Sequence, residues 1–227
     1  MGPSAVIFDL DGTLLDTLPD LADSLNLALA KKGLAVRDYE EIRLMIGSGV
    51  TKLIERALAP ADSSGSGQWR PEEGLVEAIR ADFKSEYKLR QLDKTRPYQG
   101  VEKLLEKLGQ MGVPLAVLSN KDHENTLAII GHFFPGRFKV VQGAEPSLPL
   151  KPDPAGALRS LAALGADKGR ALYLGDSAVD MLTAKKASVT PLGAAWGFRP
   201  EEELIEAGAF KTFSEPMELL GFIEGLR

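Results

Sequence analysis

The segment AVIFDLDGTLLDT (residues 5–17) places two aspartates directly after a run of apolar residues. Residues 5–8 are apolar and precede Asp9, and Leu10 separates Asp9 from Asp11. Side chains at positions i and i+2 of a strand project on the same side, and open parallel sheets bind ligands beyond the carboxyl ends of their strands. The pair therefore indicates a magnesium site or a nucleophilic carboxylate. A strand that ends in an Asp-Gly turn explains the pair equally well.

Beyond residue 100, patterns of helices and strands alternate along the chain. Helix patterns cover 101–111, 123–133, 153–165 (with Asp153 as its cap) and 178–187. Short apolar runs of strand length cover 4–10, 113–119, 138–143, 170–176 and 190–196. This alternation predicts an α/β fold with a parallel sheet that helices cover on both faces.

Residues 17–95 interrupt the alternation, because they show helix patterns and no convincing strand. Asp38 and Glu41 have the spacing of a capping box, and apolar residues at helical spacing mark a longer helix at about 72–92. The segment PADSSGSGQWRP (60–71) has the composition of a polar loop. We therefore predict a helical domain, residues 17–95, inserted into a core formed by residues 1–16 and 96–227.

The composition limits the classes of partner. The 227 residues carry 27 basic and 32 acidic side chains, a net charge of −5, without a block of Lys and Arg, so we expect no nucleic-acid partner. The absence of cysteine excludes disulfides and thiolate chemistry. No run of 18 apolar residues and no signal-peptide pattern is present. We expect a cytoplasmic monomer or homodimer that does not associate with membranes.

Three further segments place polar residues near predicted strand ends. GDSAVD (175–180) sets Asp176 and Asp180 on one helix face, where they can complete a cation site with Asp9. In the alternative, Asp176 or Ser177 caps the helix and Asp180 is solvated. LSN (118–120) offers the hydroxyl of Ser119, although a role in helix capping explains this serine as well. LKPDP (150–154) offers Lys151, which is either a phosphate ligand or a surface cation. Together these groups are what a phosphoryl group and its metal require.

The segments DLDGT, LSN, LKPDP and GDSAVD, in this order, resemble the motifs of the haloacid dehalogenase-like phosphatases, and the resemblance spans essentially the whole chain. It implies a Rossmann-like core with an inserted helical cap, and it implies a role for each residue of the motifs. Asp9 would be the nucleophile that forms an aspartyl-phosphate, and Asp11 the general acid and base. The implied phosphate ligands are Ser119, Asn120 and Lys151. The implied Mg²⁺ ligands are Asp9, the main-chain carbonyl of Asp11 and Asp176, with Thr13 and Asp180 in supporting positions.

Within that family, four segments are similar to phosphoglycolate phosphatases: RLMIGSGVTKLIERAL (43–58), NKDHENT (120–126), VVQGAEPSLPLKPDP (140–154) and AAWGF (194–198). The implied substrate is 2-phosphoglycolate, a small phosphorylated metabolite, with a cap loop that consists of Arg43, Gly47, Ser48 and Gly49. A flexible connector with a solvated arginine explains that loop as well. One departure is Ala187-Ser188, where the family leads us to expect alanine-glycine. A phosphosugar mutase and a pyrophosphate or nucleotide phosphatase of the same superfamily remain the alternatives, because they share the acids, the lysine and the metal.

Overall fold

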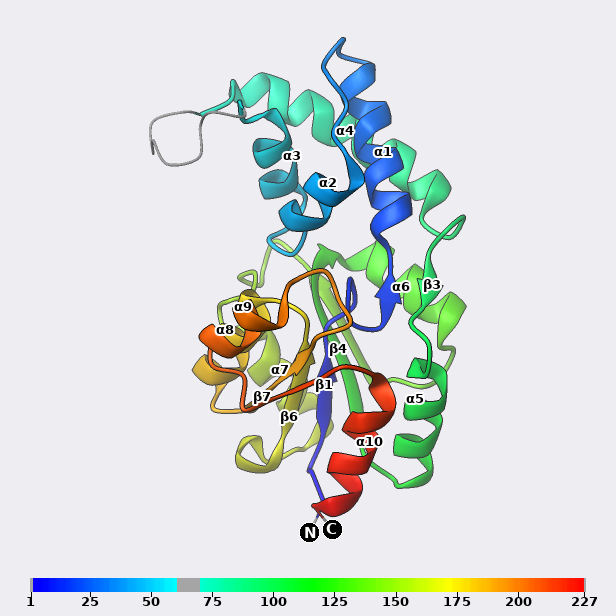
Figure 1. Cartoon of the computed structure of the whole chain (residues 1–227), viewed down its shortest axis with the longest axis vertical. Coiled ribbons are helices and arrows are strands. Elements are labelled where there is room, and N and C mark those ends of the chain that lie inside the picture. Colours follow the sequence, from blue (N-terminus) through cyan, green and yellow to red (C-terminus); the bar gives the residue numbers. More distant parts are fainter. Residues whose placement is uncertain (1, 61–69, 227) are drawn as a thin grey trace. The chain divides into compact units, whose positions relative to one another are not determined.

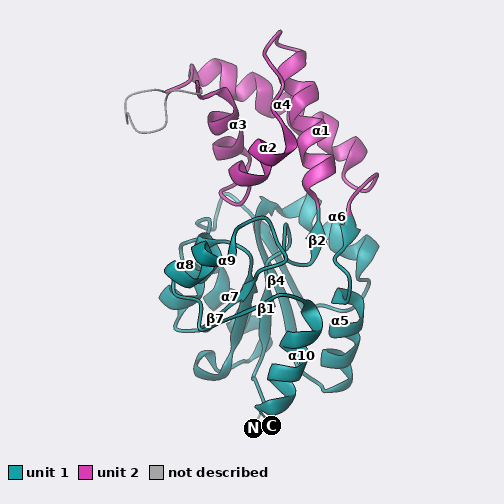
Figure 2. Cartoon of the chain, in the orientation of Figure 1, with its two compact units in different colours: residues 1–16, 96–227 teal, residues 17–95 magenta. Residues whose placement is uncertain are grey.

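The structure is a computed structural model that describes residues 2–60 and 70–226. It divides into two compact units, which Figure 2 shows in different colours. Unit 1 consists of residues 1–16 and 96–227, and unit 2 consists of residues 17–95. Most of the polar loop predicted at 60–71 lies outside the described residues, since these exclude 61–69.

Unit 1 contains a six-stranded sheet in the order β5-β4-β1-β6-β7-β8, with every neighbouring pair parallel. The strands are β1 (Val6–Phe8), β4 (Leu115–Asp122), β5 (Val140–Ala144), β6 (Leu172–Gly175), β7 (Thr190–Ala194) and β8 (Lys211–Phe213). β1 lies between β4 and β6, so Ile7 pairs with Ala116 on one side and with Tyr173 on the other. The chain winds outward from β1 in both directions, and such sheets bind ligands at the carboxyl ends of the strands.

Helices cover both faces of this sheet (Figure 1). They are α5 (Val101–Gln110), α6 (His123–Phe133), α7 (Ala155–Leu164), α8 (Ala178–Ala187), α9 (Glu201–Glu206) and α10 (Pro216–Gly225). On the face that α7 and α8 cover, Ile7, Ala116 and Tyr173 pack with Leu161 and Ala184 in one buried cluster. The predicted α/β fold with a parallel, helix-covered sheet is thus confirmed.

The structure changes several predicted boundaries. The helix predicted at 153–165 begins at Ala155, because Pro154 is its N-cap residue and the Asp153 carboxylate accepts the Ala155 N–H at 2.9 Å. The opening strand is shorter than the predicted 4–10, and β4 continues to Asp122. The sequence patterns missed β8 and the antiparallel pair β2 (Leu15–Asp16) with β3 (Arg96–Pro97).

Unit 2 consists of α1 (Leu18–Ala30), α2 (Tyr39–Met45), α3 (Val50–Leu58) and α4 (Glu73–Arg90), and its described residues contain no strand. The capping box of Asp38 and Glu41 is present at the start of α2. Leu25, Ile54 and Ile79 are fully buried in the core that these amphipathic helices form. Across the part of the chain that the structure describes, we find no helix with the length and apolar character that a membrane crossing requires.

Candidate active site

Three buried carboxylates meet at the carboxyl ends of β1 and β6. Asp9 follows β1, Asp176 follows β6, and Asp180 lies in the first turn of α8. Each offers an oxygen that lies within 4.8 Å of the others, and none of the three residues is more than 6% exposed. They meet because β1 and β6 are adjacent and the Asp9 N–H donates to the Leu174 carbonyl at 2.9 Å. Carboxylates this close repel one another unless cations intervene.

Lys151 supplies one such cation. Its Nζ lies 2.7 Å from Oδ1 of Asp9 and 2.7 Å from Oδ1 of Asp180, and its side chain is 4% exposed. Burial alone would lower the pKa of Lys151, but Asp180 and Asp9 outweigh burial and hold this pKa well above the usual value for lysine. The lysine is therefore an ammonium that bridges two acids.

One ammonium does not neutralise three carboxylates, which leaves a net charge of −2 when all three are ionised. Burial raises the pKa of Asp9 to about 7, with a further contribution from Asp180 against the opposing effect of Lys151. Burial, Asp9 and Asp180 likewise raise the pKa of Asp176 well above its usual range. A divalent cation with a preference for oxygen ligands, such as Mg²⁺, fits both this donor set and its charge.

The surroundings of Asp180 direct it toward Lys151. Its Oδ2 accepts from the Ser177 N–H at 3.2 Å and from the Ser177 hydroxyl at 2.6 Å, in a capping box that begins α8. Its Oδ1 accepts from the Tyr173 hydroxyl at 3.3 Å. The alternative of a solvated acid is wrong for Asp180, because the residue is fully buried. The capping serine is Ser177, so capping and the acid cluster coexist here.

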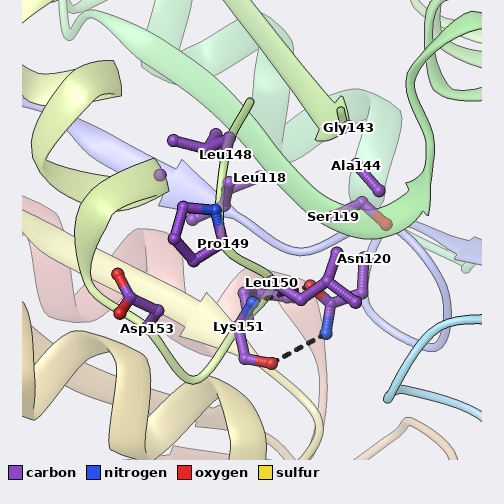
Figure 3. A pocket seen from close by; sticks show the side chains of 11 residues that line it. Leu118, Ser119, Asn120, Gly143, Ala144, Leu148, Pro149, Leu150, Lys151 and Asp153 are labelled. Carbon is purple, nitrogen blue, oxygen red and sulfur yellow. Dashed lines mark hydrogen bonds between the residues drawn. The ribbon is translucent and has the colours of Figure 1, made fainter. Parts of the chain in front are cut away.

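The segment Ser119-Asn120 lies at the same edge of the sheet, in β4. The Asn120 side-chain amide donates to the Lys151 carbonyl at 3.1 Å, and its Oδ1 accepts the Lys151 N–H at 2.8 Å. Figure 3 shows Asn120 beside the main chain of Lys151 and, with Ser119, in the lining of a pocket. Both polar atoms of the Asn120 side chain thus hold the backbone of the bridging lysine.

A second lysine with a largely inaccessible side chain, which the sequence motifs did not indicate, contacts Asp11. Lys121 Nζ lies 2.8 Å from Oδ1 and 2.9 Å from Oδ2 of Asp11, and the two side chains are 6% and 12% exposed. Lys121 follows Ser119 by two positions, and its N–H donates to the Ser119 hydroxyl at 3.1 Å. That i, i+2 spacing, which also relates Asp9 and Asp11, is the sequence signal that could have identified Lys121.

The loop after β1 packs tightly against Asp176. Thr13 is fully buried, and its hydroxyl donates to Oδ1 of Asp176 at 3.4 Å. Gly12 has a φ of +84°, and a Cβ there would lie 2.1 Å from Oδ2 of Asp176. The glycine of DLDGT is therefore required both for its backbone conformation and for its closeness to the acid.

The four residues predicted as a cap loop all belong to unit 2. The Nε of Arg43 lies 2.9 Å from a carboxylate oxygen of Glu40. Gly47 and Gly49 have φ values of +111° and +87°, and Gly49 is the N-cap residue of α3. The Ser48 hydroxyl accepts from the Arg56 guanidinium at 3.1 Å. Contact between this loop and a substrate stays a prediction.

Comparisons with known proteins agree with this architecture. The family model of the haloacid dehalogenase-like hydrolases matches residues 6–194. A phosphoglycolate phosphatase of Rhodobacter capsulatus is 35% identical over 225 residues, which cover 97% of this chain and 97% of that protein. One of Caulobacter vibrioides is 34% identical over 199 residues, which cover 87% of this chain and 81% of that protein. The crystal structure of a presumed phosphoglycolate phosphatase from Lactobacillus delbrueckii subsp. bulgaricus has a TM-score of 0.90 at 30% identity and covers 98% of this chain and 99% of that one.

The parallel sheet, the buried acids at its carboxyl edge and these similarities define the class of protein: the chain belongs to the haloacid dehalogenase-like hydrolases. Its similarity to phosphatases of that family over nearly the whole chain makes it, more narrowly, a phosphoric monoester hydrolase.

Proposed function

We propose that this chain is a Mg²⁺-dependent phosphatase that hydrolyses 2-phosphoglycolate through an aspartyl-phosphate on Asp9. The observation that carries the proposal is the ammonium of Lys151, which bridges Asp9 and Asp180 at 2.7 Å among buried carboxylates. A carboxylate can attack a phosphate dianion only where cations offset the repulsion between them, and this site supplies one cation and the ligands for another. The similarity to phosphoglycolate phosphatases supports the choice of substrate.

In the first half of the reaction, a carboxylate oxygen of Asp9 attacks phosphorus and the bond from phosphorus to the leaving oxygen breaks. Asp11 donates a proton to that oxygen, so glycolate leaves as the alcohol. Lys151 and the Ser119 hydroxyl bind the phosphoryl oxygens, and Asn120 holds the main chain of Lys151 in place. Asp9, Asp176 and the main-chain carbonyl of Asp11 would hold Mg²⁺, which when bound would supply positive charge that offsets the negative charge of the phosphoryl group.

In the second half, water attacks phosphorus and the bond between phosphorus and Asp9 breaks. Asp11, now a carboxylate, accepts a proton from that water, which returns both acids to their starting forms and releases inorganic phosphate. Asp180 keeps Lys151 near Asp9 through its own contact at 2.7 Å. The same residues thus serve both halves of the reaction.

The test is the specificity constant kcat/KM, measured with Mg²⁺ for 2-phosphoglycolate, p-nitrophenyl phosphate, glucose phosphates, pyrophosphate and a nucleotide. We expect 2-phosphoglycolate to be preferred by about a hundredfold, which is about 2.7 kcal/mol in the transition state. EDTA should abolish turnover, and added Mg²⁺ should restore it. A flat profile would refute the substrate, and conversion of one glucose phosphate into another would favour a mutase.

The covalent step needs its own test. Acid quenching with ³²P-labelled substrate should leave label on the wild-type protein and none on Asp9→Asn, which should also lack turnover. Asp153→Asn is a matched control, because the Asp153 carboxylate accepts the Ala155 N–H at the start of α7 and lies outside the acid cluster. Turnover by Asp9→Asn in a preparation free of wild-type enzyme would show that Asp9 is not the nucleophile.

A further inference from the structure

The loop after β7, residues 195–198, contacts two parts of the acid site. The Phe198 N–H donates to Oδ2 of Asp176 at 2.8 Å. The indole N–H of Trp196 donates to the main-chain carbonyl of Thr13 at 3.0 Å. This loop, which we call the β7 loop, therefore links the end of β6 to the segment that follows β1.

Gly197 brings the β7 loop against Asp176 more closely than any other residue type would allow. A Cβ at position 197 would lie 2.3 Å from Cβ and 2.7 Å from Oδ2 of Asp176, and 2.4 Å from the Gly12 carbonyl oxygen. All three distances are shorter than real Cβ contacts, which essentially never fall below 3.0 Å. Gly197 does not have a positive φ. The position therefore requires glycine because glycine lacks a side chain, and not because of its backbone freedom.

Asp176 is thus held from several sides. Its Oδ2 accepts from Phe198, its Oδ1 lies 3.4 Å from the Thr13 hydroxyl, and Gly12 and Gly197 close the space around it. A carboxylate with this little freedom presents its oxygens in one fixed direction. Mg²⁺ requires near-ideal octahedral geometry with ligands at about 2.0–2.1 Å, whereas Ca²⁺ accepts irregular geometry at about 2.3–2.6 Å.

We propose that the β7 loop, through Gly197 and Phe198, fixes the position of Asp176 and thereby gives the site its preference for Mg²⁺ over Ca²⁺. The inference rests on the proposed function in that Asp176 is taken as a metal ligand. A displaced Asp176 carboxylate would weaken Mg²⁺ binding more than Ca²⁺ binding, because only the smaller ion depends on strict geometry.

The test compares Gly197→Ala with Gly193→Ala in the full chain. Gly193 is a matched control, because a Cβ there would also be crowded, at 2.8 Å from Thr212, yet it faces β8 and α9 and not the acids. Calorimetric titration with Mg²⁺ alone and with Ca²⁺ alone gives the two dissociation constants of each variant. We expect Gly197→Ala to weaken Mg²⁺ binding about tenfold and Ca²⁺ binding about twofold, and Gly193→Ala to leave the ratio unchanged.

A ratio that stays within about twofold of wild type in Gly197→Ala, or that shifts equally in both variants, would overturn the inference. If Gly197→Ala does not fold, Trp196→Phe replaces it, because it removes the indole N–H donor to Thr13 and keeps an aromatic ring and Gly197 in place. This variant should lower the Mg²⁺ to Ca²⁺ preference by about threefold, and an unchanged preference would again overturn the inference. Failure of the wild type to bind Mg²⁺ would instead refute the proposed function.

Discussion

The buried carboxylate of Asp9 links metal binding to pH. Burial and Asp180 raise the pKa of Asp9 from 3.8 to about 7, so below pH 7 the residue carries a proton that Mg²⁺ must displace. We expect the affinity for Mg²⁺ to fall at least tenfold for each pH unit below 7, because Asp176, whose pKa is also raised, adds a second proton to displace. Calorimetric titrations between pH 5.5 and 8.5 would measure this, and an affinity that does not change across the range would contradict it.

The raised pKa of Asp9 also determines how the stability of the metal-free chain depends on pH. A carboxyl whose pKa is higher in the folded state than in the unfolded state makes the fold less stable as it ionises, here as pH rises from about 4 to 7. We expect the metal-free chain to lose stability across this window and Asp9→Asn to lose less. Thermal melts at each pH, with EDTA and with Mg²⁺, would measure both slopes. Equal slopes in the two proteins would exclude Asp9 as the cause.

Lys121 provides a test of the role of Asp11. Its Nζ contacts both carboxylate oxygens of Asp11, at 2.8 and 2.9 Å, so it fixes the direction in which that carboxyl points. A general acid matters for an alkyl leaving group such as glycolate and little for p-nitrophenolate, which leaves without a proton. We expect Lys121→Met to lower kcat about a hundredfold for 2-phosphoglycolate and about threefold for p-nitrophenyl phosphate.

The control for this variant is Lys103→Met, since Lys103 is exposed on α5. Lys121→Arg should recover part of the lost kcat, because it keeps a cation beside Asp11. Equal losses on both substrates would mean that Lys121 binds the phosphoryl group or supports the fold, and would refute its role as a positioning residue for Asp11.

At the scale of elements, the end of α8 contains a strained residue. Ser188 follows the helix with a φ of +59° and a ψ of +39°, the left-handed conformation that glycine adopts without a steric penalty. Ser188→Gly should therefore raise the free energy of unfolding by about 1 kcal/mol and the melting temperature by about 2–4 °C. Denaturant titrations would measure the change. Ser188→Ala keeps the strain and should give no gain, so an equal gain from alanine would exclude strain as the cause.

Patterns in the sequence predicted the longer elements well, because their apolar periodicity matches the burial that the fold imposes. The helix predicted at 178–187 coincides with α8, and the capping box of α2 is present. β8 and the pair β2–β3 have only two or three residues each, too few to show any periodicity. β4 extends past its predicted end because its register against β5 shifts after Leu118.

For the acid site, too, local sequence predicts some features and not others. The order of motifs predicted that the acids and Lys151 lie at one sheet edge, because strand ends of a parallel sheet share that edge. The i, i+2 spacing from Ser119 could have indicated Lys121, but its partner Asp11 lies 110 positions away, and no local pattern indicates that pairing. Gly197 is similar, since its constraint comes from Asp176 and Gly12, which are distant in sequence.

At the scale of the whole molecule, the chain passes between the two units twice, after residue 16 and after residue 95. Within unit 1, the pair β2–β3 joins the two passages, with Asp16 opposite Arg96. Within unit 2, the carboxylate of Asp20 joins them again, because it accepts from the main-chain N–H groups of Lys94 and Thr95 and from the Thr95 hydroxyl, at 2.8–3.1 Å. Each unit therefore holds the two passages together by its own contacts.

Asp20 is 1% exposed, so its loss would leave buried donors without an acceptor. Asp20→Ala should lower the free energy of unfolding by about 3 kcal/mol and speed amide exchange at Lys94 and Thr95. Asp20→Asn keeps one acceptor oxygen and should lower the free energy of unfolding by less. Asp23→Ala is the matched control on the same helix, because Asp23 contacts two exposed side chains, those of Lys94 and Tyr39, and such surface contacts contribute about 0–1 kcal/mol. If the two alanine variants lose equal stability, or if exchange at Thr95 does not change in Asp20→Ala, the Asp20 carboxylate does not hold the two passages together.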